Sequence, residues 1–183
     1  MSEFVIVTSC APTLAGLKTG SLFTDPYTDK AALEQEIREM NRILKKKGIR
    51  LVVVRYSEER ALIYMFRPSQ LEEDLKDPEC RRILRDAGYR KMTVEYCVRR
   101  LRQRFLKSGE FPHEIGLFLG YPSEDVKGYI LHNGNGSKYV GYWKVYGDVT
   151  CAKKIFARYK ACTKSYFSQW NAGTSVHDLA VAV

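Results

Sequence analysis

The sequence contains no CxxC motif and no close pair of cysteines. Its five cysteines are an odd number spread over 183 residues. A disulfide framework would need paired cysteines, and a structural zinc site would need ligands at short regular spacings, so neither is expected. No haem attachment motif is present either, and the sequence identifies no cofactor. We interpret all five cysteines as reduced thiols: Cys10, Cys80, Cys97, Cys151 and Cys162.

Long apolar runs are also missing. No segment approaches the length of a membrane span, and the N-terminus has no basic region followed by an apolar run and a cleavage site. The sequence therefore predicts a cytoplasmic protein without a membrane span. Internal repeats, low-complexity segments and long linkers are absent, and a chain of this length with 45% hydrophobic residues is sufficient for one core. We expect a single domain over residues 1–183.

Positive charge is abundant and unevenly distributed. The formal net charge is +9, and the segment 80–107 alone holds ten basic residues against two acidic ones. Such a segment suggests nucleic acid as a partner, with four candidate contacts: Arg99, Arg100, Arg102 and Arg104. On a helix these arginines spread over the whole polar side. A solvated helix face has the same pattern, and we favour that interpretation.

The order of the elements predicts an α+β fold. Residues 51–56 and 61–66, rich in Val, Ile and Tyr, indicate a hairpin, and an aromatic-rich strand is expected near 139–146. The run 115–119 is apolar on every side and predicts a buried strand. We therefore expect a small mixed sheet, made of the hairpin 51–66 and strands near 115–119 and 139–146, covered by several helices.

Capping signals place the helices. Thr28 or Asp29 begins an amphipathic helix that ends at Gly48, and Asp148 begins the last long helix. Ser69 with Glu72 resembles a capping box, and Asp77–Pro78 begins another helix. A third helix in this region is expected to run from Thr93 to Gly109. The residues 4–7 suit a short strand or the start of a helix equally well.

Three blocks of the sequence resemble one known family. They are Cys10–Lys18 (CAPTLAGLK) with Ser21–Phe23, Phe111–Pro122 (FPHEIGLFLGYP) continuing to Glu124–Val126, and Gly141–Asp148 (GYWKVYGD). Together they are similar to a bacterial family catalogued only as a domain of unknown function. The resemblance implies no reaction. It implies an association with flavodoxin-like or ferrous-iron-uptake proteins.

Cys10 is the residue with the most chemical potential in these blocks. If Pro12 or Thr13 began a helix, the thiol would lie near a helix N-terminus, where the helix dipole favours the thiolate. His113 could then take its proton while Glu114 or the distant Asp148 orients the imidazole, which predicts thiol-dependent hydrolase or transferase chemistry. The alternative is that Cys10 is a small packed core residue and that His113 and Glu114 end a strand.

Two non-enzymatic interpretations remain open. Cys10, His113 and Glu114 are also competent iron or zinc ligands, although their spacing matches no known site, and we expect no dedicated metal centre. The turn before the helix that begins near Ser123 could bind an anion, with four candidate residues: Lys18, Gly120, Tyr121 and Ser123. It is not a Walker A or GxGxxG loop, and Glu124 and Asp125 in the first turn would repel a phosphate. The partner is therefore left as an unidentified small molecule or protein.

Overall fold

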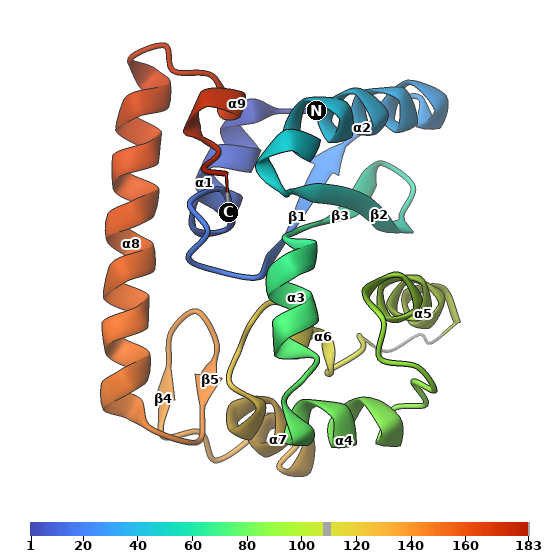
Figure 1. Ribbon diagram of the computed structural model, residues 1–183, viewed down its shortest axis with the longest axis vertical. Helices are drawn as coiled ribbons and strands as arrows, with labels where there is room; N and C mark the ends of the chain where they lie inside the picture. Colours follow the sequence, from blue (N-terminus) through green and yellow to red (C-terminus); the bar gives the residue numbers. More distant parts are fainter. Residues whose placement is uncertain (108–110, 183) are drawn as a thin grey trace.

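The computed structural model describes residues 1–107 and 111–182. Its centre is a three-stranded antiparallel sheet in the order β1-β3-β2, surrounded by helices (Figure 1). The strands are β1 (Gly20–Pro26), β2 (Arg50–Tyr56) and β3 (Arg60–Phe66). The α+β class and the hairpin that joins β2 to β3 are confirmed. β1, which the sequence analysis did not predict, pairs with β3 along its whole length.

β3 is the central strand of the sheet, and both of its faces are buried because helices pack against the sheet from either side. Ala61, Ile63 and Met65 belong to one apolar cluster, whereas Tyr64 and Phe66 belong to another. Successive side chains of a strand point to opposite faces, so this alternation divides the core into two layers, one on each side of the sheet.

The first layer is formed by helices from both ends of the chain. It contains α1 (Glu3–Leu14), α2 (Lys30–Leu44) and the short α9 (Val176–Leu179). The Asp29 side chain caps α2 by accepting hydrogen bonds from the backbone N–H groups of Ala31 and Ala32. A 3-10 turn, η1 (Lys45–Lys47), follows, and Gly48 ends it with a left-handed backbone (φ 70°).

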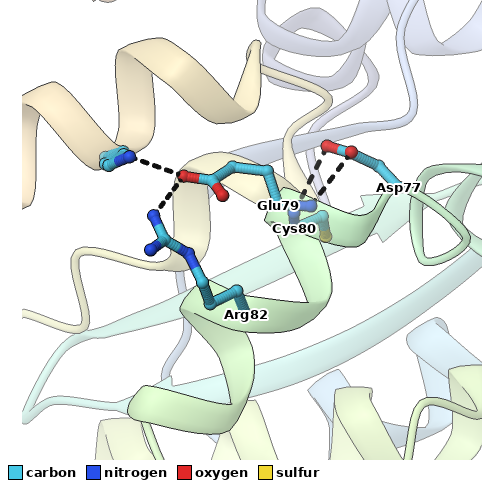
Figure 2. Close-up of polar contacts among 5 residues, drawn as sticks. Asp77, Glu79, Cys80 and Arg82 are labelled. Carbon is cyan, nitrogen blue, oxygen red and sulfur yellow. Dashed lines mark hydrogen bonds and ion pairs between the residues drawn. The ribbon is translucent and has the colours of Figure 1, made fainter.

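The second layer is built from five helices: α3 (Pro68–Asp74), α4 (Pro78–Asp86), α5 (Val94–Lys107), α6 (Ile115–Phe118) and α7 (Ser123–Leu131). Figure 2 shows Asp77 capping α4 through the backbone N–H groups of Glu79 and Cys80. The Glu79 carboxylate also pairs with Arg82 and, on α7, with Lys127. α4 and α7 are thereby held together at the surface.

The last long helix, α8 (Val149–Asn171), extends along one side of the molecule (Figure 1). Asp148 caps it as predicted, accepting from the backbone N–H groups of Thr150 and Cys151. Its first half packs against a small hairpin made of β4 (Tyr139–Val140) and β5 (Lys144–Val145), which forms a third apolar cluster centred on Trp143 and Phe156. Its second half lies beside α1.

The predicted strand 115–119 is wrong: residues 115–118 form helix α6. An apolar run of this length cannot distinguish a buried strand from a buried helix, because every side is apolar in both cases. The outcome depends on the neighbours. β3 already has a strand on each side, and the Phe118 carbonyl accepts a hydrogen bond from the Tyr64 hydroxyl (2.5 Å) instead of joining a ladder.

Other details of the predicted sheet also need correction. The sheet is antiparallel, not mixed, and residues 139–146 form the β4–β5 hairpin, separate from the main sheet. α3 begins at Pro68 after Arg67, so Ser69 and Glu72 form no capping box. Residues 4–7 are helical. Gly109, expected to end α5, lies outside the described residues. Within the described ranges, none of the helices is both long and apolar enough to cross a membrane.

Candidate functional site

Two of the sequence blocks meet at one cavity of about 280 Å³ between α6, α7 and the β4–β5 hairpin. Block 111–126 contributes one wall, and block 141–148 contributes the other. Seven side chains supply most of the lining: Phe111, His113, Tyr121, Val126, Tyr129, Trp143 and Lys144. An apolar, aromatic cavity with a few polar groups at its edge is the usual form of a small-molecule site.

Asp125 holds the two walls together. It is 3% exposed, and its carboxylate accepts hydrogen bonds from Trp143 Nε1 (2.7 Å) and from the backbone N–H groups of Tyr146 (2.7 Å) and Gly147 (2.8 Å). A carboxylate in the first turn of α7 also interacts favourably with the helix dipole. Asp125 therefore fixes the hairpin to α7, and its oxygen atoms are already satisfied by this role.

The aromatic rings of the cavity support one another. Tyr121 stacks on Trp143 with 4.7 Å between ring centroids, and Phe156 of α8 packs edge-on against the other side of the indole at 4.5 Å. Trp143 is 7% exposed, so its position is set by packing on both sides and by its hydrogen bond to Asp125. The wall is therefore rigid before any ligand binds.

Gly116 lines the cavity and allows α6 to lie close to α7. A Cβ atom at this position would lie 2.7 Å from Cγ2 of Val126, closer than side-chain carbons approach one another. α6 can pack this closely on α7 only because residue 116 has no side chain. The sequence analysis treated this glycine as part of a strand, and its role becomes visible only once α6 and α7 are placed together.

Two cationic or titratable groups lie at the edge of the cavity. Lys144 Nζ donates a hydrogen bond to the Gly134 carbonyl (2.7 Å) and lies 5.8 Å from the centre of the Tyr129 ring. His113 is exposed, and its ring packs at a tilt against Tyr129 (5.1 Å). Within the described ranges, no protein group forms a hydrogen bond with the imidazole of His113. It is therefore available to a bound molecule.

Glu114, predicted to orient His113, interacts with other residues. Its 3% exposed carboxylate pairs with Arg104 of α5 and accepts a hydrogen bond from the Tyr89 hydroxyl (3.0 Å). Burial and the neighbouring Glu114 carboxylate raise the pKa of Tyr89 well above its ordinary value, so the phenol remains a donor. Glu114 connects the 111–114 turn to α5, and the structure gives it no contact with the imidazole.

Cys10 lies in the core, in the last part of α1 and not at a helix N-terminus. It is 0% exposed and belongs to the apolar cluster between α1, α2 and the sheet, whereas His113 lines the cavity beside α7. Burial raises the pKa of its thiol to about 12, outweighing the opposite effects of Lys18 and of the Ser21 hydroxyl. The structure thus gives Cys10 the surroundings of a packed residue and does not bring it together with His113.

The residues considered for anion binding occupy two different environments. Lys18 lies 5.2 Å from the centre of the Tyr121 ring, and burial lowers the pKa of its ammonium group to about 8. Gly120, Tyr121 and Ser123 line another cavity, which they share with three carboxylates: Asp74, Asp77 and Glu124. Those carboxylates would repel an anion, as the sequence analysis expected of the first turn of α7.

The four arginines of α5 do not form a common surface. Arg104 pairs with Glu114, and Arg99 lies over the Tyr96 ring at 5.7 Å. Arg102 is exposed, whereas Arg100 is half-buried near Gly88. This distribution agrees with the interpretation of a solvated helix face. Among the described residues there is also no group of three or more His, Cys, Asp or Glu side chains placed to hold a metal ion.

A family model described as a protein of unknown function, DUF3793, matches residues 6–180. The chain belongs to the DUF3793 family. No curated protein and no solved structure matches it. Because the match extends over nearly the whole chain, the DUF3793 sequence pattern includes α1, the cavity and α8.

Sequence reasoning missed the residues that organise this DUF3793 chain. Asp125 was considered only as a charge that would repel phosphate, and Trp143 only as part of an aromatic-rich strand. Arg67, which is 0% exposed, was not considered at all. A signal was present for the first two, since each lies in one of the conspicuous blocks. Nothing in the sequence indicated that Arg67 is buried.

Proposed function

We propose that this DUF3793 protein is a binding protein for a small, planar, mostly apolar molecule that carries an anionic group. The ligand would lie in the cavity against Trp143 and Tyr129, with its charged end directed to Lys144 and His113. The observation that supports the proposal is that the second and third sequence blocks meet at this cavity, although they are separated in the chain. A volume of about 280 Å³ limits the ligand to a small molecule.

The wall is preorganised for such a ligand. Stacking between Tyr121 and Trp143 and the buried hydrogen bond to Asp125 fix the apolar surface, so little ordering entropy is lost on binding. Lys144 supplies a charge-assisted donor and His113 a second donor that has no protein partner within the described ranges. Among the cavity-lining residues that the structure describes there is no serine, threonine or cysteine beside either group, which favours binding over covalent chemistry.

Binding can be measured through Trp143. The chain has two tryptophans, so the Trp170→Phe variant makes the Trp143 indole the only tryptophan reporter of the cavity. We expect saturable fluorescence changes with probes such as benzoate, anthranilate and indole-3-acetate, and weaker changes with neutral benzamide and indole. Saturation-transfer NMR should detect the same probes as bound.

The role of Lys144 provides the control. Lys144→Met should weaken the binding of the anionic probes about tenfold, because a charge-assisted hydrogen bond is lost, and should leave the affinity for the neutral probes unchanged. Lys138 is exposed, lies just before the same hairpin and does not line the cavity, so Lys138→Met should have no effect. Equal losses in the two variants, or no saturable binding of any probe at millimolar concentration, would contradict the proposal.

Thiol chemistry, the function expected from the sequence, has a separate test. Burial raises the pKa of Cys80 to about 12 and that of Cys97 to about 11, as it does for Cys10, whereas Cys151 is exposed. We expect iodoacetamide at neutral pH to label Cys151 first and Cys10 only after unfolding. Mass-spectrometric mapping of the labelled peptides gives the order, and His113→Ala should not change it. Fast labelling of Cys10 that depends on His113 would restore the thiol mechanism.

A further inference from the structure

Helix α8 carries a basic surface that none of the described acidic residues neutralises. From Val149 to Asn171 the sequence has five basic residues and no Asp or Glu. All five are exposed: Lys153, Lys154, Arg158, Lys160 and Lys164. Within residues 1–107 and 111–182, none of them has a carboxylate at ion-pair distance. The α8 charge therefore faces solvent uncompensated, unlike that of Arg104 on α5.

Three of these lysines form a row. Lys153, Lys160 and Lys164 occupy positions i, i+7 and i+11, which lie on the same side of a helix with 3.6 residues per turn. At 1.5 Å of rise per residue the row is about 16 Å long. A linear array of cations of this length is suited to a linear polyanion.

An aromatic groove lies directly beside the first part of this row. It has a volume of about 460 Å³ and is bounded by Tyr139 and Tyr142 of the hairpin segment and by Lys153, Phe156 and Lys160 of α8. Tyr139 is 38% exposed and Tyr142 is 44% exposed. The rings are held in place, because Phe156 packs against both, with centroid distances of 6.2 Å to Tyr139 and 5.6 Å to Tyr142.

Charge and stacking surface are combined in the same groove. Lys153 Nζ lies 4.8 Å from the centre of the Tyr139 ring, so an ammonium group and an aromatic face are presented together. Proteins that bind single strands use this combination, in which cations follow the phosphates and aromatic rings stack on the bases. We propose that the Tyr139–Tyr142 groove and the lysine row of α8 bind single-stranded nucleic acid.

The composition of the surface favours a nucleic acid over an anionic membrane. The large apolar side chains exposed in the described chain include none from α8, so the helix has no apolar anchor to insert beside its lysines. The exposed aromatics at the groove are tyrosines held in position by Phe156, which suits stacking on a base. The cavity of the proposed small-molecule site shares only Gly141 with this groove, and neither proposal depends on the other.

Salt dependence tests the lysine row. Fluorescence anisotropy with labelled 15-mers of deoxythymidine and of uridine should show binding at 50 mM KCl. With three phosphate contacts on a single strand, the affinity should fall about twentyfold between 50 and 200 mM KCl. The variant Lys153→Gln/Lys160→Gln/Lys164→Gln should lose most of the affinity and most of this salt dependence. Arg99→Gln/Arg102→Gln removes exposed charge from α5 and should leave both nearly unchanged.

Stacking is tested by removing one ring. Tyr142→Ala should weaken the binding of the 15-mers at least fivefold. An abasic strand of the same length has no bases to stack, so it should bind the variant and the original protein with equal affinity. Thermal unfolding checks that the variants are folded, and the lysine variant, which changes only exposed side chains, tests the proposal even if Tyr142→Ala does not fold. Absent binding at 50 mM KCl, equal losses in the α5 variant, or lysine-dependent binding to phosphatidylserine vesicles without oligonucleotide binding would overturn the proposal.

Discussion

Arg67→Met is expected to lower the free energy of unfolding by about 3–5 kcal/mol, the largest effect expected of any single substitution in this chain. The Arg67 guanidinium is fully buried and donates to four backbone carbonyls, of Thr13 (2.6 Å), Leu14 (2.6 Å), Lys47 (2.9 Å) and Val181 (2.8 Å). Methionine fills similar space without donors. It would remove all four of these hydrogen bonds, although the carbonyls of Thr13 and Leu14 would each keep one backbone donor.

The four carbonyls explain why a buried cation is tolerated here, since none of the described residues gives it a carboxylate partner. Two belong to the C-terminal end of α1 and one to the end of η1, where unpaired carbonyls carry partial negative charge. The fourth is in the C-terminal tail. Arg67 therefore joins three segments that are far apart in the sequence, while burial lowers the pKa of its guanidinium without removing the charge.

Thermal unfolding followed by circular dichroism measures the effect. For a chain of this size, a loss of about 3–5 kcal/mol corresponds to a melting temperature lower by about 6–20 °C. Arg67→Lys should be intermediate, because an ammonium group keeps the charge but cannot match the planar arrangement of donors. Arg38→Met, on the exposed side of α2, is the matched control and should change little. An Arg67→Met variant as stable as the original protein would contradict the structural role.

The second large effect is expected at Asp125. Asp125→Ala removes an acceptor from Trp143 Nε1 and from two backbone N–H groups, so it should lower the free energy of unfolding by about 3 kcal/mol and detach the hairpin from α7. In the Trp170→Phe background, Trp143 emission should shift to longer wavelength as the indole becomes hydrated. Binding of the aromatic probes should be lost with it.

The adjacent acid provides the comparison for this variant. Glu124 is exposed and also lies in the first turn of α7, so Glu124→Gln changes a neighbouring charge without touching the buried hydrogen bonds. Its emission maximum and probe affinities should match those of the original protein. If Asp125→Ala kept the short-wavelength emission of Trp143, the hairpin would be held by packing against Phe156 alone, and the anchoring role would be wrong.

The residues that form the site could not be identified from the sequence blocks alone. The first block supplied Cys10, which has an apparent chemical signature, but the structure buries it among Ile6, Val7 and Leu14. The second and third blocks supplied the cavity. Its shape depends on two of their residues to which the sequence analysis gave no role in a site, Gly116 and Asp125. Gly116 permits the close packing of α6 on α7. Asp125 accepts a hydrogen bond from Trp143, which is about twenty positions further along the chain.

The sequence by itself determined the features that depend on local interactions. The hairpin over 51–66, the caps at Asp29, Asp77 and Asp148 and the stop at Gly48 were all confirmed, because each requires only neighbouring residues and a turn with defined backbone angles. The α+β class followed from the order of these elements.

Only the tertiary structure decided the features that depend on distant neighbours. The run 115–119 is equally apolar as a strand or a helix, and it forms α6, where the Phe118 carbonyl accepts a hydrogen bond from the Tyr64 hydroxyl of β3. Segments from both ends of the chain bury Cys10 and Arg67. This burial raises the pKa of the Cys10 thiol and places the Arg67 guanidinium among backbone carbonyls. The aromatic cavity likewise exists only where α7 and the hairpin meet, through hydrogen bonds to Asp125 that no local pattern encodes.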